Sequence, residues 1–199
     1  MKRKTVKAMK KATVLFLFIG ILFVVLSLLT YEKPEIDRQP DRRISDEVKK
    51  YQPLVEKYAK KYHVSSYIDV ILAMMMQESG GKGNDPMQSS ESYCGEVGCI
   101  DDPEHSIKQG VYYFSQVLEK ADGDVKLAVQ SYNFGKGFID YVKNQSGEYS
   151  QQEAINFSKQ MYDKDRETYT CYREEAKRYN ACYGDIYYVR DVMAYRETL

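Results

Sequence analysis

The residues from Met74 to Ser90 read MMMQESGGKGNDPMQSS, and this stretch decides the fold prediction. An apolar run leads to one carboxylate, Glu78, and two glycines follow shortly after it. The apolar run predicts a helix, and the glycines predict its end. Glu78 is therefore expected in the last helical turn, followed by a turn that presents amides and hydroxyls.

Glu78 has the surroundings of an acid that keeps its proton. The partial negative charge at the C-terminal end of a helix disfavours a further negative charge. Packing against the methionines would also remove water from the carboxyl group, and desolvation raises a carboxyl pKa. General acid catalysis needs a carboxylic acid that is protonated near neutrality, so Glu78 is the candidate catalytic residue.

The N-terminal region predicts a membrane anchor. Residues 13–30 read TVLFLFIGILFVVLSLLT, which is uncharged and long enough to span a bilayer. Residues 1–12 carry six basic side chains and no acid, so we expect a cytoplasmic tail there and the remainder of the chain on the cell-wall side of the membrane. A cleaved signal peptide is the alternative. The apolar segment is longer than a usual signal core and lacks an A-x-A-like site after it, which favours a retained signal anchor.

The rest of the chain divides into a linker and one domain. Residues 31–44 are charged, contain two prolines and show no apolar period, so they predict a linker. Residues 45–199 are numerous enough for one domain with its own core. Beyond the tail, 23 of the 29 Lys and Arg remain against 29 Asp and Glu, a formal charge of −6. This charge, with no basic cluster, argues against a nucleic-acid partner.

Helical patterns predict a compact, mainly α domain. Ser45 precedes two acids and should cap a first helix, whose apolar residues recur at helical spacing as far as Tyr62. Asp102 should cap another helix. The long loop from 79 to 101 leaves room for a short β element, and loops of this length are usually functional. Further helices are expected at 67–77, 106–120, 125–132, 138–143, 151–161 and 186–196.

The four cysteines predict two disulfides. All of them lie in the exported part, where disulfides persist, and proximity favours pairing Cys94 with Cys99 and Cys171 with Cys182. Their spacing fits a zinc site less well, although that alternative stays open. A catalytic cysteine is weaker still, because only His63 and His105 are available as its base. We expect neither a metal nor a cofactor.

Three motifs in order then point to a family. They are QESGG at 77–81, DPMQSSE at 85–91 and QSYNFG at 130–135. Together they resemble the lysozyme-like superfamily, which includes goose-type lysozymes and soluble lytic transglycosylases. The resemblance runs from about 45 to 196 and is greatest to the N-terminal muramidase module of bifunctional wall hydrolases from conjugative elements of Gram-positive bacteria. It implies a lysozyme-like α+β fold, with peptidoglycan as substrate and conjugation or secretion machinery as a partner.

The resemblance also implies roles for individual residues. Glu78 matches the acid that protonates the glycosidic oxygen between N-acetylmuramic acid and N-acetylglucosamine. Candidates for a second carboxylate follow on the loop, chiefly Asp85 and Glu91, with Asp101 and Asp102 further along. Met87 and Gln88 match the pair that lines the sugar groove, where Ser89 and Ser90 are expected to add hydroxyl contacts. Tyr132 and Asn133 match the segment that faces Glu78 across the groove.

The reaction stays open at this level. A second carboxylate that orients water gives hydrolysis, whereas a single glutamate acting as acid and then base gives a 1,6-anhydro end, as in lytic transglycosylases. The sequence favours hydrolysis through its resemblance to muramidases. Two non-enzymatic alternatives are a wall-binding component of a conjugation apparatus and an anchored adaptor for protein partners.

Overall fold

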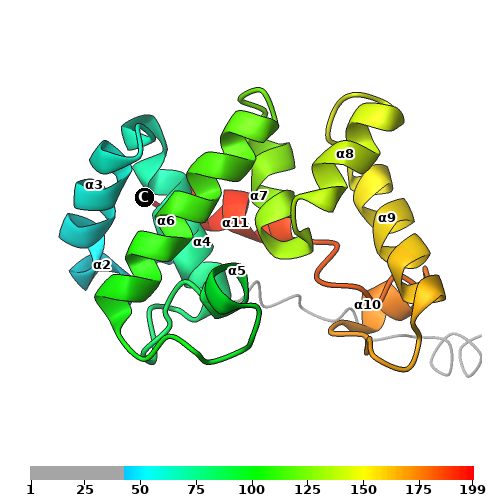
Figure 1. Cartoon of the computed structure of the whole chain (residues 1–199), viewed down its shortest axis with the longest axis horizontal. Helices are drawn as coiled ribbons and strands as arrows, with labels where there is room; N and C mark the ends of the chain where they lie inside the picture. The colour runs from blue at the N-terminus through cyan, green and yellow to red at the C-terminus, as the bar shows by residue number, and fades with distance from the viewer. Residues whose placement is uncertain (1–42) are drawn as a thin grey trace, which may run out of the picture. The chain divides into compact units, whose positions relative to one another are not determined.

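The computed structural model describes residues 43–199, and within that range every regular element is a helix (Figure 1). The mainly α prediction is confirmed. The short β element is absent from the described residues: the 79–101 loop holds a short helix, α5, and is otherwise irregular. The elements in order are α2 (Asp46–Lys50), α3 (Gln52–Lys61), the 3₁₀-helix η1 (Ser65–Tyr67), α4 (Ile68–Glu78), α5 (Ser90–Cys94), α6 (Pro103–Lys120), α7 (Val125–Phe134), α8 (Gly137–Asn144), α9 (Gln151–Lys164), α10 (Glu174–Lys177) and α11 (Tyr188–Arg196).

The predicted tail at 1–12, the anchor at 13–30 and nearly all of the linker at 31–44 lie outside the described residues. Among residues 43–199, no helix combines the length and the apolar character needed to cross a bilayer.

The helix starts follow the capping residues in the sequence. The Ser45 side chain accepts a hydrogen bond from the backbone N–H of Val48, and Asp102 accepts one from His105, as their positions predicted. The remaining predicted helices are also present, with ends shifted by a few residues. The sequence patterns did not indicate η1, α5 or α10, each of which is only three to five residues long.

The first predicted helix is broken in two. The apolar spacing between Val48 and Tyr62 reads as one helix, but α2 ends at Lys50 and α3 begins at Gln52. Pro53 is the physical reason, because its ring lacks an N–H and would clash with the carbonyl four residues earlier. At the start of α3 the proline is tolerated, since the first N–H groups of a helix have no partner in any case.

The last helix of the chain returns to the helix that carries Glu78. α4 is buried along six consecutive residues, from Val70 to Met75, so it must be covered on several sides. α11 packs against α4 and α7, while α6 packs against α3 and α7 (Figure 1). This arrangement brings the start of α11 to the C-terminal end of α4.

Candidate active site

A hollow of about 370 Å³ opens beside the C-terminal end of α4. Its walls come from the 79–101 loop, from α7 and from the segment 165–187. A second hollow of about 290 Å³ shares Gln88, Glu91, Tyr132 and Asn133 with the first, so the two form one groove. The structure thus brings most of the predicted site residues together along one surface.

Glu78 is the last residue of α4 and lies on the groove wall, as the sequence predicted. Burial raises the pKa of its carboxyl group to about 7. The Tyr188 hydroxyl, which donates a hydrogen bond of 2.5 Å to Oε1, acts in the opposite direction, and the negative charges of Asp85 and Asp185 raise the pKa further. Near neutral pH the group therefore exchanges its proton readily.

Tyr188 is the partner of Glu78 that the motifs did not assign. It is fully buried at the start of α11, and 110 residues separate it from Glu78. Its contact depends on the packing of α11 against α4, which no local pattern encodes. The only sequence signal is the stretch YGDIYYV at 183–189, which the resemblance covers without giving Tyr188 a role.

Asp85 lies in the same hollow, but its pKa is shifted in the opposite direction. Partial burial acts to raise its pKa, yet hydrogen bonds from the Ser106 and Ser90 hydroxyls and from the backbone N–H groups of Ser89 and Ser90 outweigh it, so the pKa is lowered. The Ser106 and Ser90 bonds are 2.5 and 2.6 Å long. Near neutral pH the site therefore holds one carboxyl group that is about half protonated and one that is ionised.

The other predicted residues of the loop differ in placement. The Gln88 side chain is exposed at the groove, and its Nε2 donates to the backbone carbonyl of Asp85. Ser90 is buried beneath the first hollow and Ser89 beneath the second, where both donate to Asp85. Glu91 is exposed and lines both hollows.

Met87 does not lie on the groove wall. Its side chain is fully buried in the core, so it lacks access to a sugar. Its backbone carbonyl instead accepts a hydrogen bond of 2.9 Å from the hydroxyl of Tyr132, which ties the loop to α7. Buried residues in a loop follow no regular spacing, unlike those in a helix or strand. The sequence therefore could not show that Met87 is buried and Gln88 exposed.

Gly110 permits this tie between the loop and α7. A Cβ at Gly110 would lie 2.7 Å from the Met87 Cβ and 2.8 Å from the Tyr132 hydroxyl oxygen. We expect Gly110→Ala to lower the free energy of unfolding by about 1–3 kcal/mol, because overpacking displaces both neighbours. Urea unfolding measures this change. Gly137→Ala is the matched control, because Gly137 also lies in a helix but has open space around it. An equal loss in both variants would contradict the steric explanation.

Asn133 and Asp185 form the far wall. The Asn133 Oδ1 accepts a 2.8 Å hydrogen bond from the backbone N–H of Asp185, and both residues line the first hollow. The Asp185 carboxylate is buried and pairs with Arg173 at 2.6 Å. Arg173 also pairs with Asp191 on α11 at 2.6 Å. This network holds the segment 165–187 against the site, and no local sequence pattern indicates it.

Both disulfides lie next to residues that line the groove: Val97 and Gly98 lie between Cys94 and Cys99, and Thr170 and Tyr172 flank Cys171. Cys94 is bonded to Cys99 and Cys171 to Cys182, the pairing that proximity favoured. All four cysteines are thereby used, so the zinc alternative has no thiolate to draw on. Over residues 43–199, no cluster of three His, Cys, Asp or Glu side chains has an arrangement that fits a metal ion.

Several known proteins are similar to this chain. The chain is 41% identical to the bifunctional muramidase/DL-endopeptidase CwlT of Bacillus subtilis strain 168, over 76% of this chain and 42% of CwlT, so it spans about two fifths of that relative. It is 37% identical to the uncharacterised membrane protein YocA of the same strain, over 100% of this chain and 91% of YocA. A crystal structure of a lipoprotein-like protein of the NLP/P60 family from Staphylococcus aureus Mu50 superposes with a TM-score of 0.67 at 38% identity, over 77% of this chain and 53% of that one. Residues 45–196 match the family described as lysozyme-like, and the chain belongs to that family.

Proposed function

We propose that this chain cleaves the glycan strands of peptidoglycan, at the β-1,4 bond between N-acetylmuramic acid and N-acetylglucosamine, with Glu78 as the general acid. One observation carries the proposal: a carboxyl group with a pKa of about 7 lies on the wall of a polar groove. Membership of the lysozyme-like family supports it, as does the 41% identity to a relative whose name includes a muramidase.

Tyr188 fixes which oxygen of Glu78 delivers the proton. Its hydroxyl donates to Oε1, so the proton of the neutral carboxyl group resides on Oε2. That proton passes to the glycosidic oxygen as the bond to the sugar breaks, and positive charge develops on the ring. The ionised Glu78 that remains accepts a stronger hydrogen bond from Tyr188 than the neutral form does.

Asp85 is the better candidate for the second carboxylate. Its lowered pKa keeps it ionised, and it lies close enough to Glu78 for its charge to raise the pKa of that group. A fixed negative charge beside the groove stabilises the positive charge of the oxocarbenium-like transition state. Glu91 is exposed to water on the same wall, where its charge acts through a higher dielectric and stabilises less.

Tyr188→Phe should move the pH dependence of cleavage. The Tyr188 hydrogen bond lowers the pKa of Glu78, so its loss raises that pKa above 7. Activity requires the protonated acid, and the alkaline limb of the kcat/KM profile should therefore shift to higher pH, with a lower maximum. Tyr183→Phe is the control, because the Tyr183 hydroxyl donates to the backbone carbonyl of Phe134 and not to Glu78. A shift of the limb in both variants, or to lower pH in Tyr188→Phe, would contradict the role given to Tyr188.

Formation of a 1,6-anhydro end is the second candidate, and the bonding of Asp85 favours it. Both carboxylate oxygens of Asp85 already accept hydrogen bonds from Ser89, Ser90 and Ser106. Few acceptor sites are left to activate a water molecule. In that case Glu78 acts first as the acid and then as the base, while the C6 hydroxyl of the sugar attacks.

Product masses test the proposal and separate the two reactions. The exported part of the chain is incubated with purified peptidoglycan, and the released muropeptides are weighed by mass spectrometry. Reducing muramic acid ends support hydrolysis, and ends lighter by one water support the transglycosylase. Binding without release would overturn the enzymatic proposal and favour a wall-binding protein, and absence of binding would favour an adaptor.

The place of action is also a proposal. We propose that residues 13–30 anchor the chain, with its N-terminus in the cytoplasm and the lysozyme-like domain on the cell-wall side. The 37% identity over the whole of this chain to YocA, which is named as a membrane protein, supports an anchor. Local opening of the wall during conjugative transfer, with secretion machinery as partner, stays a prediction from the resemblance.

A further inference from the structure

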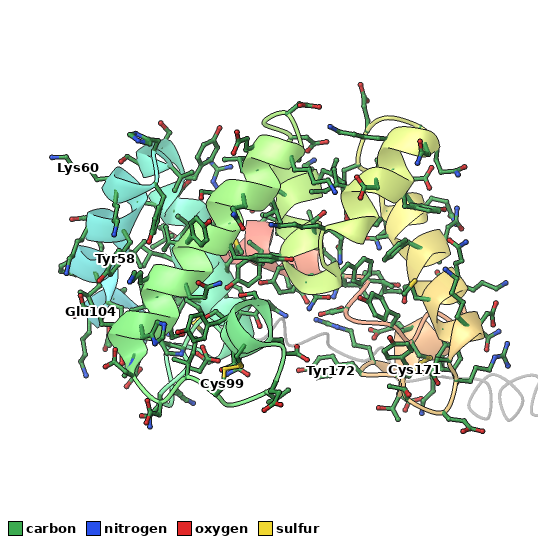
Figure 2. All side chains as sticks on the ribbon, in the orientation of Figure 1. Tyr58, Lys60, Cys99, Glu104, Cys171 and Tyr172 are labelled. Carbon is green, nitrogen blue, oxygen red and sulfur yellow. A yellow bond between two sulfur atoms is a disulfide. The ribbon has the colours of Figure 1, made fainter. Side chains whose placement is uncertain are left out.

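One large side chain beside the groove has no part in the core. Tyr172 is 79% exposed, yet it lines the same hollow as Glu78. Figure 2 shows Tyr172 on the segment that carries Cys171, extending toward the loop that carries Cys99. Its exposure leaves the ring free to contact a ligand in the hollow.

Tyr172 is held firmly on both sides. The preceding residue, Cys171, is bonded to Cys182. The following residue, Arg173, is paired with Asp185 and Asp191, and both carboxylates are largely buried. The Arg173 guanidinium also lies 5.9 Å from the centre of the Tyr172 ring. The ring is therefore presented to the groove on a backbone that has little freedom to lose on binding.

The surroundings of the ring select the kind of ligand. The opposite wall offers Val97, which is 80% exposed, in the loop closed by Cys94 and Cys99. Thr170 adds a hydroxyl on the side of Tyr172. A pyranose ring presents C–H groups on its faces and hydroxyls at its edges, so it fits an aromatic face beside polar groups. The electron-rich face of the Tyr172 ring attracts the C–H groups of the sugar.

The charge of the hollow further restricts the kind of ligand that it can bind. Four acidic residues line it (Glu78, Asp85, Glu91 and Asp185), and none of its lining residues is basic. Arg173 pairs with Asp185, and Glu78 is about half protonated at pH 7, so Asp85 and Glu91 supply most of the negative charge. Anionic groups, such as the carboxylates of peptidoglycan stem peptides, are repelled from such a surface. A neutral N-acetylhexosamine ring is not repelled, and its acetamido and hydroxyl groups match the exposed amide of Gln88 and the Thr170 hydroxyl.

We propose that Tyr172, with Thr170, forms a saccharide subsite at the rim of the groove that stacks on a neutral N-acetylhexosamine ring of the glycan strand. The proposal rests on the proposed function, because it takes the groove to bind peptidoglycan glycan. The Cys171–Cys182 disulfide and the Arg173 ion pairs hold the backbone on both sides of Tyr172, so the subsite is preformed.

Binding to peptidoglycan tests the subsite without relying on catalysis. The Glu78→Gln chain serves as the background, so that the polymer is not degraded. Adding Tyr172→Ala should weaken binding about tenfold in a sedimentation assay, whereas Tyr172→Phe should leave it within about twofold because the ring face is kept. Tyr179→Ala is the matched control, because Tyr179 is an exposed tyrosine of the same segment that does not line the groove.

A second substrate separates sugar from peptide. Glycan strands stripped of stem peptides by an amidase should show the same tenfold loss for Tyr172→Ala. Loss on intact peptidoglycan alone would assign Tyr172 to the peptide and overturn the proposal, as would equal binding by Tyr172→Ala and Tyr179→Ala. In the active chain, Tyr172→Ala should raise KM and leave kcat nearly unchanged. If Glu78→Gln does not reduce product release, the proposed catalytic role fails, and the binding comparison still decides the subsite.

Discussion

Glu78→Gln should reduce glycan cleavage by a factor of about 10²–10⁴, the range that a positioned general acid contributes. Glutamine keeps the shape and the hydrogen bond from Tyr188, but it has no proton to give to the leaving oxygen. The fall should appear in kcat, with binding to peptidoglycan retained. Release of reducing or anhydro ends from purified peptidoglycan measures it.

Glu91→Gln is the matched control, because it neutralises a carboxylate on the same groove wall that is open to water. It should reduce cleavage by less than about tenfold. If Glu91→Gln caused the larger loss, the roles of the two glutamates would have to be exchanged.

Glu78→Gln should also have a measurable effect on stability. The pKa of Glu78 is about 7 in the folded protein and 4.5 in its reference state. Between these values the folded chain holds more protons than the unfolded chain, so the free energy of unfolding falls as the pH rises from 4.5 to 7. Glu78→Gln removes this loss and should be more stable than the wild type at pH 8, by at most about 3 kcal/mol, but not at pH 4. Urea unfolding at the two pH values checks the sign.

Asp85→Asn should produce the second large loss, on the order of 10²-fold in kcat, because it removes the fixed negative charge beside the sugar. It should also lower the free energy of unfolding by about 1–3 kcal/mol. Asparagine replaces one of the two acceptor oxygens with an NH₂ group, which cannot accept the hydrogen bonds that this oxygen receives. Those hydrogen bonds come from Ser89, Ser90 and Ser106.

Two controls separate the charge of Asp85 from its structural part. Asp101→Asn changes an exposed carboxylate of the same loop that lies outside both hollows, and it should leave cleavage unchanged. Ser106→Ala removes two hydrogen bonds, the one that its hydroxyl donates to Asp85 and the one that it accepts from the backbone N–H of Met87, but it keeps the charge. It should therefore lower the free energy of unfolding by about 1–3 kcal/mol and reduce kcat by far less than Asp85→Asn. Equal kinetic losses in Ser106→Ala and Asp85→Asn would show that Asp85 acts only by holding the loop.

The parts of the site that sequence could predict are those set by local rules. Glu78 at a helix end, the caps at Ser45 and Asp102, and the two short-range disulfides follow from neighbours in the chain. A proline also acts locally, and the break that Pro53 causes was available in the sequence but was outweighed by the apolar spacing around it.

The remaining features depend on distant packing. Tyr188 reaches Glu78 only because α11 lies on α4, and Arg173 meets Asp191 only because the segment before α11 folds back on it. The burial of Met87 likewise depends on a glycine in α6 that lets the loop approach. Hydrophobic periodicity reports which face of a helix is covered but not which side chain covers it, so these contacts were not predictable.

If Glu78 is the general acid, as proposed, its raised pKa also links the activity of this chain to the acidity of its surroundings. With a pKa of about 7, half of the molecules carry the catalytic proton at pH 7, and about one in ten carries it at pH 8. A fall from pH 7 to pH 6 would therefore raise the protonated share from about one half to about nine tenths. The number of working molecules would change within the time of a proton transfer, without synthesis or degradation of any protein.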